Sequence, residues 1–233
     1  MCPPSRFVLL DRLPGFCRAT FVSAILVSEM SQKYRVNVYI DGFNLYHAID
    51  DLGDDTLKWV DLHKLSTALL NPHQTLNEVK YFSAYATWRP DAYKRHRDYV
   101  AANEAMGVQV IMGRFKAKKI HCKAQCGQSF STHEEKETDV NIGAHLIADT
   151  LQNKFDSALI ITADTDLSAV IELAKTLSNN QKRINAVAPP DRMSRARELK
   201  HLFMITKGKI RSSLLPEQTQ TTTGIIIKPI KYN

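Results

Sequence analysis

Two aspartates, Asp164 and Asp166, directly follow an apolar run in the stretch LIITADTDLSAVIEL, residues 159–173. A third, Asp41, directly follows the run RVNVYI, and Asp139 stands at the start of the helical pattern in TDVNIGAHLIADT. Carboxylates gathered in a small volume repel one another unless their pKa values rise or cations lie between them. Mg²⁺ and Mn²⁺ are the hard ions that prefer carboxylate and water oxygens. A divalent-metal site is therefore the chemistry that these residues indicate.

Such a site suits the hydrolysis of phosphodiesters. Two divalent ions roughly 4 Å apart can activate water and stabilise both the attacking and the leaving oxygen. The sequence around these aspartates contains no thiol or imidazole cluster that would favour zinc. It also lacks a Gly-rich phosphate loop, so no nucleotide cofactor is expected. Each aspartate taken singly has a simpler interpretation, as a helix N-cap or turn residue after a strand.

The elements that must position these residues alternate along the chain. Strand patterns occupy residues 35–40, 78–86, 108–112, 157–162 and 183–188, and helical patterns occupy residues 43–49, 61–70, 91–106, 139–153, 166–177 and 194–202. This alternation predicts a three-layer α/β/α sandwich with a mostly parallel central sheet. Ligands of such sheets bind beyond the carboxyl ends of the strands. Asp41, Asp164 and Asp166 are therefore expected at one edge, and Asp139 is placed to point into the same crevice.

Local signals mark several helix ends. Pro90 opens one helical pattern and Gly107 is expected as its left-handed cap. Thr138 is expected as the N-cap of the helix that carries Asp139.

Three ordered segments resemble the NYN domain, the LabA-like branch of the PIN-like nuclease superfamily. They are VYIDGFNLYHAI, EEKETDVNIGAHLIADT and FDSALIITADTDLSAVIELAK, and the likeness runs from about residue 36 to residue 188. The resemblance implies an α/β/α domain with a metal-dependent ribonuclease site. The positions that match the motifs of that site are Asp41, Asn44, Asp139, Asp164 and Asp166.

Roles follow from this match. Asp41, Asp139 and Asp164 are expected as direct metal ligands, and Asp166 as a ligand or as a residue that orients a bound water. Asn44 suits a hydrogen bond to a scissile phosphate or to a water of the second shell, unless it is only a helix-start residue.

Lys136, beside the second motif, either neutralises a phosphate or is a solvated charge beside Glu134 and its acidic neighbours. The position held by Glu137 is often glycine in this family, which places the local turn in question. Thr162 stands where serine is common, and the change preserves a hydroxyl group.

The segment from 114 to 136 interrupts the strand and helix rhythm and is rich in Cys and Lys. One tetrahedral zinc site is conceivable from His121, Cys122, Cys126 and His133, but C-x3-C without a second knuckle is a weak zinc signal. The resemblance implies a structural hairpin here instead. The basic side chains form either an RNA-facing lip or a solvated surface; they are Arg114, Lys116, Lys118, Lys119 and Lys123.

A second basic group, Lys94, Arg95 and Arg97, follows Trp88 and Tyr93 in the sequence. These aromatic residues have the chemistry to stack on the bases of single-stranded RNA. For Trp88, however, packing in the core is the expected role.

Composition agrees with a polyanionic partner. The 233 residues carry a net charge of +7, and basic side chains gain affinity for a phosphate backbone by releasing its counterions. The four cysteines are too few and too unevenly spaced for a disulfide scaffold, which fits a cytoplasmic protein. No run of eighteen apolar residues predicts a membrane span. The sequence does not indicate an oligomeric state.

The expected organisation is an N-terminal extension at 1–30, a nuclease domain at 31–206 that includes the insertion at 114–136, and a basic tail at 207–233. The expected function is metal-dependent endoribonuclease activity on RNA with Mg²⁺ or Mn²⁺. One alternative is a regulatory NYN module that binds RNA with little or no catalysis. Another is a phosphohydrolase that forms a phosphoaspartate, although the Asp-x-Asp of TADTD follows a late strand, whereas Asp41 has no second aspartate beside it.

Overall fold

Five parallel strands form the central sheet in the computed structural model, which describes residues 33–122, 126 and 128–232. The strands are β1 (Tyr34–Asp41), β2 (Gln74–Ser83), β3 (Gln109–Met112), β6 (Ser157–Ile161) and β7 (Arg183–Val187). Their order across the sheet is β3-β2-β1-β6-β7. The parallel sheet predicted from the sequence is confirmed. The predicted extension at 1–30 lies outside the described residues.

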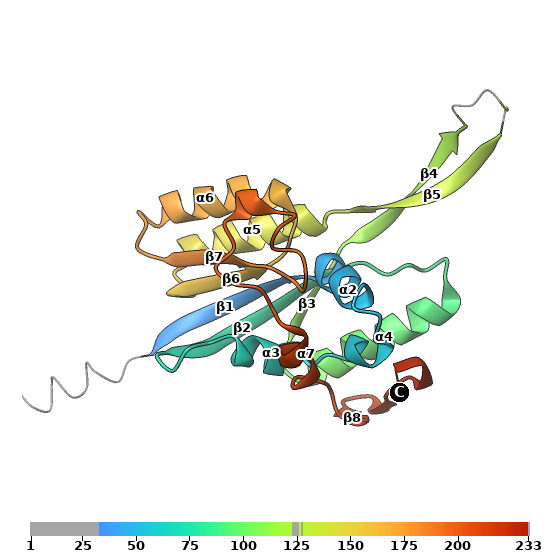
Figure 1. Cartoon of the computed structure of the whole chain (residues 1–233), viewed down its shortest axis with the longest axis horizontal. Coiled ribbons are helices and arrows are strands. Elements are labelled where there is room, and N and C mark those ends of the chain that lie inside the picture. Colours follow the sequence, from blue (N-terminus) through green and yellow to red (C-terminus); the bar gives the residue numbers. More distant parts are fainter. Residues whose placement is uncertain (1–32, 123–125, 127, 233) are drawn as a thin grey trace, which may run out of the picture. The chain divides into compact units, whose positions relative to one another are not determined.

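Helices cover both faces of this sheet, as Figure 1 shows. One face carries α2 (Gly42–Asp50), α3 (Leu62–Ala68) and α4 (Pro90–Ala105), and the other carries α5 (Thr138–Leu151) and α6 (Ser168–Leu177). Alternate residues of β1 enter different cores, because successive side chains of a strand point to opposite faces. Val38 and Ile40 pack with the first group of helices, whereas Tyr39 packs with α5 and α6. The three-layer architecture is thus confirmed.

The chain changes its direction of travel across the sheet at β1. From there β2 and β3 lie on one side, and β6 and β7 lie on the other. Ile40 of β1 pairs with Ile161 of β6, so the residues that follow these two strands emerge next to each other. A crevice at such a switch point is the usual ligand site of a parallel sheet.

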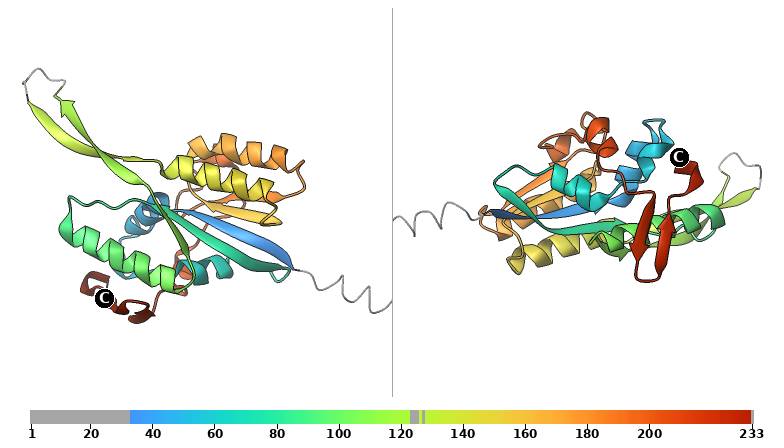
Figure 2. Two further views of the ribbon diagram at one scale, coloured as in Figure 1. Left: turned by 180° about the vertical axis from the view of Figure 1, so that it is seen from behind. Right: turned by 90° about the horizontal axis from the view of Figure 1, so that it is seen from below.

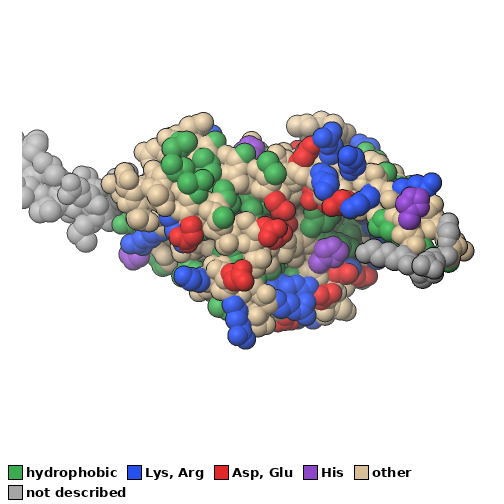
Figure 3. Space-filling view, turned by 90° about the horizontal axis from the view of Figure 1, so that it is seen from above, with side chains coloured by type: hydrophobic (Ala, Val, Ile, Leu, Met, Phe, Trp, Pro, Cys, Tyr) green, Lys and Arg blue, Asp and Glu red, His purple; other side chains and the backbone are tan. Residues whose placement is uncertain are grey.

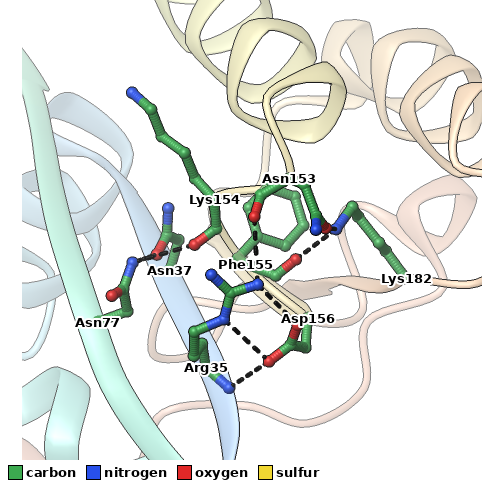
Figure 4. Close-up of polar contacts among 8 residues, drawn as sticks. All are labelled: Arg35, Asn37, Asn77, Asn153, Lys154, Phe155, Asp156 and Lys182. Carbon is green, nitrogen blue, oxygen red and sulfur yellow. Dashed lines mark hydrogen bonds and ion pairs between the residues drawn. The ribbon is translucent and has the colours of Figure 1, made fainter.

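The opposite edge of the sheet is closed by paired polar groups (Figure 4). The Arg35 guanidinium lies 2.9 Å from a carboxylate oxygen of Asp156, and the Arg35 backbone N–H donates to the other oxygen. Lys182 donates to the side-chain oxygen of Asn153 and to the Phe155 carbonyl. The carboxylate at this edge therefore has a cation beside it, which is the arrangement expected of a structural residue.

The segment at 114–136 forms an antiparallel hairpin of β4 (Arg114–His121) and β5 (Ser129–Lys136). Arg114 pairs with Lys136 at its base, and His121 pairs with Ser129 near its tip. Figures 1 and 2 show the hairpin projecting away from the sheet. Its strands are mostly exposed on both faces, so it adds little to the core.

The predicted helix at 194–202 is wrong. Only a single 3-10 turn, η3 (Arg197–Leu199), forms there, and Lys200 ends it in the left-handed conformation at φ 47°. Ala196 and Leu199 are buried, whereas Arg195 and Arg197 are exposed. From Leu202 the chain instead runs beside the edge of β7, where the Leu202 backbone N–H donates to the Ala186 carbonyl and the Phe203 carbonyl accepts from the Ala188 backbone N–H, each at 2.9 Å. This pairing replaces further helical turns.

The chain from 207 onward folds back on the domain. Its elements are α7 (Lys207–Arg211), β8 (Gln218–Thr221), β9 (Gly224–Ile227) and η4 (Ile230–Tyr232). The β8–β9 hairpin packs beside α4, which the right-hand view of Figure 2 shows. Leu215 and Tyr232 join Trp59 in a small separate core. Within the described residues no helix is both long and apolar enough to cross a membrane.

Candidate active site

A cavity of about 600 Å³ opens where the strands end, and three of the predicted ligands line it. These are Asp41 at the end of β1, Asp139 in the first turn of α5, and Asp164 in the loop after β6. Asn44 of α2 also lines the cavity. Asp166 does not line it and is exposed in the short turn η2 (Thr165–Leu167).

Asp41 is buried and held by a fixed set of donors. It is the N-cap of α2, and its Oδ1 accepts a hydrogen bond of 3.1 Å from the backbone N–H of Asn44. Its Oδ2 accepts from the Asn44 amide group and, at 3.0 Å, from the Thr162 hydroxyl. Only 2% of the residue is exposed. The N-cap interpretation and the site interpretation of Asp41 are therefore compatible, because one carboxylate serves both.

Asn44 and Thr162 connect β1 and α2 to the loop after β6. The Asn44 carbonyl accepts from the Ala163 backbone N–H at 3.2 Å, while its amide donates to Asp41. The Thr162 hydroxyl accepts from the backbone N–H of Asp164 at 3.0 Å. This network fixes the relative positions of Asp41 and Asp164, which are far apart in the sequence. The Thr162 hydroxyl therefore acts as both a donor, to Asp41, and an acceptor, from Asp164.

The start of α5 differs from its prediction. Thr138 is the first residue of the helix, and the N-cap is Glu137, which has a left-handed backbone at φ 82°. Glycine adopts this conformation without strain, which explains why glycine suits the position. The capping group is instead the Glu135 carboxylate, which accepts from the backbone N–H and the hydroxyl of Thr138. Glu135 also lines the cavity, and sequence reasoning missed it.

Two acidic side chains of the cavity, those of Asp41 and Asp139, have raised pKa values. Burial raises the pKa of Asp41, against the opposing hydrogen bonds from Asn44 and Thr162. Burial, followed by the charges of Asp164 and Asp41, raises the pKa of Asp139 to about 6. At the other edge of the sheet, Arg35 lowers the pKa of Asp156. The cavity thus gathers three aspartates that have no direct ion-pair partner, since no ion pair among the described residues involves Asp41, Asp139 or Asp164.

The donor set around the cavity consists of carboxylate, amide and hydroxyl oxygens, which suits a hard divalent cation. In this arrangement the carboxylates do not surround a common point. No three His, Cys, Asp or Glu residues in the described part of the chain are grouped closely enough to hold a metal ion. Both carboxylate oxygens of Asp41 accept hydrogen bonds. Asp139 and Asp164 have the exposure needed to turn toward an ion.

The four residues considered for zinc do not form a metal site among the described residues. His133 lies on β5 opposite Ala117, several residue pairs from the tip that carries Cys122 and Cys126. Its ring instead stacks on Trp88, with 3.6 Å between the ring centroids and 6° between the planes.

Most of the basic residues at the base of the hairpin are paired. The Lys136 ammonium group lies 2.9 Å from the Glu134 carboxylate. This ion pair favours the interpretation of Lys136 as a solvated charge beside acidic neighbours. Lys118 contacts Glu134 at 3.5 Å, and Arg114 contacts Glu137 at 2.7 Å. Lys116 and Lys119 form no ion pair with the described residues, and both are exposed on β4. None of the five lines the cavity.

Aromatic side chains form another wall of the cavity, and this wall was largely missed. Trp88 was expected in the core, yet 37% of it is exposed. Phe115 of the hairpin packs edge-on against both Trp88 and Phe43, at 4.7 and 5.5 Å between centroids. All of these residues and His133 line the cavity. Figure 3 shows a recess floored by hydrophobic side chains, with acidic and basic side chains on its rim.

His96 of α4 is a further lining residue without a sequence signal. Burial lowers its pKa to about 4, so the ring is neutral near pH 7. It lies 3.4 Å from the Ser83 hydroxyl and 3.5 Å from the Tyr81 hydroxyl.

Comparison with known proteins matches a family model, a curated protein of low identity and a solved structure of low similarity. The family model of the NYN domain matches residues 35–204. The 6-hydroxy-3-succinoylpyridine 3-monooxygenase HspA of Pseudomonas putida is 23% identical over 200 residues, which are 71% of this chain and 63% of that protein. The chain therefore spans less than two thirds of that relative. A crystal structure of a protein of unknown function from Vibrio parahaemolyticus, VPA0982, has a TM-score of 0.48 and 16% identity, covering 75% of this chain and 93% of that one.

Proposed function

The chain belongs to the NYN domain family, and from this premise we propose that it is a divalent-metal-dependent endoribonuclease. The proposed substrate is RNA, and the proposed site is the cavity around Asp41, Asp139 and Asp164. A cytoplasmic location belongs to the same proposal. The LabA-like branch is the subgroup that its three motifs resemble most.

One observation carries this proposal. Three carboxylates from separate segments of the chain line one cavity, and burial and mutual repulsion raise the pKa values of two of them. A fold gains no stability from such an arrangement unless a cation is bound. Perturbed carboxylates in a cleft are typical of functional sites.

The residues of the cavity have distinct parts in the proposed reaction. Asp41 is the most firmly oriented ligand, because Asn44 and Thr162 fix its carboxylate. Asp139 and Asp164 complete the proposed ligand set. Asp166 is exposed and does not line the cavity, and its proposed part is to bind the metal ion or to orient a bound water. A bound Mg²⁺ or Mn²⁺ would supply positive charge to the phosphate and lower the pKa of a coordinated water. Asn44 acts here as a positioning residue, since both ends of its amide are already engaged.

The proposal is tested with purified wild type and Asp164→Asn on a mixed pool of RNA. We expect the wild type to cut RNA with Mg²⁺ or Mn²⁺ and to stop when chelator is added. Asp164→Asn should lose at least about 100-fold in rate, because it removes one charged ligand from the site. Asp191→Asn is the matched control, since Asp191 is exposed, lies outside the cavity and has a backbone that asparagine tolerates.

Other results would select the alternatives. Binding of RNA by both proteins without cleavage would favour a regulatory module. A trapped phosphorylated enzyme would favour the phosphohydrolase. Chelator-resistant cleavage that survives in Asp164→Asn would contradict the metal site.

A second candidate function rests on the relative from Pseudomonas putida, whose name is that of a pyridine-ring monooxygenase. The aromatic wall of Trp88, Phe115 and Phe43 gives the cavity a surface on which a flat ring can stack. Monooxygenation consumes O₂ and two electrons from a reductant. Oxygen uptake with a hydroxypyridine and an added two-electron donor, lost on Trp88→Ala, would support this candidate. Cleavage of RNA without such uptake would support the first.

A further inference from the structure

The last residues of the chain line the same cavity as the aspartates. Lys231 and Tyr232 belong to the short turn η4, and both contribute to the cavity wall. They lie beyond residue 204, where the match to the NYN domain ends. The cavity is therefore built partly by a segment that the family match does not cover.

This segment is anchored firmly enough to act as a wall. The Tyr232 ring stacks on Trp59 at 6.1 Å between centroids and 29° between planes. Trp59 is fully buried, and its ring N–H donates to the Pro216 carbonyl at 3.1 Å. The Leu215 backbone N–H donates to the Trp59 carbonyl at 2.9 Å. Lys231, next to Tyr232, thus has a defined place at the cavity.

Two further cations reach the cavity from α4. Arg89 immediately precedes the first residue of this helix, and Arg95 lies on the face that points into the cavity with Ala92, His96 and Tyr99. The Arg95 guanidinium is close enough to Tyr232 to oppose the rise that burial causes in the pKa of that phenol. The helix and the C-terminal segment therefore meet at this part of the wall.

These cations are not neutralised by carboxylates. No ion pair among the described residues involves Arg89, Arg95 or Lys231. Lys58 also lines the cavity, but it is paired with both Asp50 and Asp55. Lys231 lowers the pKa of Asp55 only as a more distant charge, since Lys58 holds that carboxylate. Unpaired cations that converge on a cavity are suited to bind an anion.

A chain of aromatic contacts runs from β2 to the C-terminal segment. Tyr81, whose pKa is raised by burial and to a smaller extent by the Asp41 charge, contacts Tyr99 at 6.1 Å between centroids. Tyr99 contacts Trp59 at 5.8 Å, and Trp59 carries Tyr232. The aspartates of the cavity come from β1, the start of α5 and the loop after β6, whereas Arg95 and Lys231 come from α4 and the C-terminal segment. The two groups of charges therefore reach the cavity from different elements.

We propose that Arg95 and Lys231 bind a backbone phosphate of the RNA strand that lies outside the bond being cut. The C-terminal segment would then position the strand in the cavity while the aspartates act on another linkage. This inference rests on the proposed function and adds a subsite to it. Arg89 lies at the same wall and contributes to the same field.

The test measures binding of a fluorescent single-stranded oligoribonucleotide by anisotropy, with chelator present so that no cleavage interferes. Lys231→Ala and Arg95→Ala are each expected to weaken binding several-fold and to lower the slope of log Kd against log salt by about 1. The matched controls are Lys228→Ala in the same segment and Lys94→Ala on the same helix. Neither control residue lines the cavity. Both should leave the slope unchanged.

Cleavage adds a second readout. With metal, Lys231→Ala should raise KM for the long strand by a larger factor than KM for a dinucleoside monophosphate, because the short substrate has no phosphate beyond the one being cut. Strands with and without a terminal phosphate should lose equal affinity, and a loss confined to the phosphorylated strand would overturn the assignment to a backbone phosphate. Cavity variants that match their controls would also overturn it. Binding of RNA without any cleavage would contradict the nuclease function. The phosphate subsite would still be tested in that case, by comparing the binding of the cavity variants with that of their controls.

Discussion

The Asp139 carboxyl group connects the charge of the cavity to the stability of the chain. Its pKa rises from 3.8 to about 6, because burial and the neighbouring charges of Asp164 and Asp41 disfavour the ionised form. Between those two pH values the folded chain holds a proton that the unfolded chain releases. Ionisation of Asp139 therefore destabilises the folded chain as the pH rises through this window.

We expect Asp139→Asn to raise Tm at pH 7 in the presence of chelator. The gain should be about 1 kcal/mol or less, because the side chain is partly exposed to solvent. At pH 4 the gain should nearly vanish, since the wild-type group is then protonated. Thermal denaturation of both proteins at the two pH values measures this difference. An equal gain at both pH values would contradict an electrostatic origin.

At the scale of the element, the first turn of α2 touches β2 with no room for a side chain at position 42. A Cβ on Gly42 would lie 2.6 Å from the Phe82 carbonyl oxygen and 2.7 Å from the Tyr81 ring. Gly42→Ala must therefore push α2 away from the sheet, and with it the turn that carries Asp41 and Asn44. We expect a loss of about 1–3 kcal/mol in urea denaturation, together with reduced RNA cleavage.

Gly208→Ala in α7 is the control for this variant. The nearest atom to its new Cβ would be 3.9 Å away, so the change adds a methyl group without a collision. Its stability should equal or slightly exceed that of the wild type. A Gly42→Ala chain as stable and active as Gly208→Ala would show that the contact between α2 and β2 yields easily.

Local patterns predict the central elements because those elements bury one or both faces. The buried run of β6 and the apolar stripe of α5 both follow from this requirement. The β4–β5 hairpin is exposed on both faces, so its sequence carries no apolar period to read. The Gly107 cap was predicted correctly and has φ 89°. The helix predicted at 194–202 forms only one 3-10 turn, because a helical pattern in a short segment does not by itself decide against pairing with a neighbouring strand.

The residues of the candidate site also divide into those that local patterns predict and those that they do not. The edge at which Asp41 and Asp164 meet follows from their positions after parallel strands, and the structure places both at one cavity. Trp88, Phe115 and Lys231 reach the cavity from a loop, a projecting hairpin and the end of the chain. Their approach depends on contacts between distant segments, for which a single sequence gives no periodic signal.

At the scale of the whole molecule, a buried ion pair joins the sheet to the helices above it. Lys80 of β2 and Asp149 of α5 are both almost fully buried and bonded to each other, and the Tyr39 hydroxyl donates to the same carboxylate at 2.7 Å. Burial and this bond raise the pKa of Tyr39 far above its usual range. The network joins two layers through charged groups that are almost fully buried.

Removing one member of the Lys80–Asp149 pair should lower the free energy of unfolding much more than removing both. Lys80→Met leaves Asp149 buried with only Lys154 as a cation, 3.1 Å from its carboxylate, and is expected to cost about 3–5 kcal/mol. Lys80→Met combined with Asp149→Leu should recover a large part of that loss, because neither charge is then buried. Urea denaturation of the two single variants and the double variant measures the coupling. Simple additivity of the two single losses would contradict it.

The hydrogen bond from Thr162 to Asp41 spans 121 positions of the chain. During synthesis at about 5–20 residues per second, Asp41 is made roughly 6 to 24 seconds before Thr162 exists. β1 can pair with β6 only after that interval, and η4 reaches its place later still. During that interval a growing polypeptide holds Asp41 beside the ribosome, itself largely RNA, before the proposed site can be assembled.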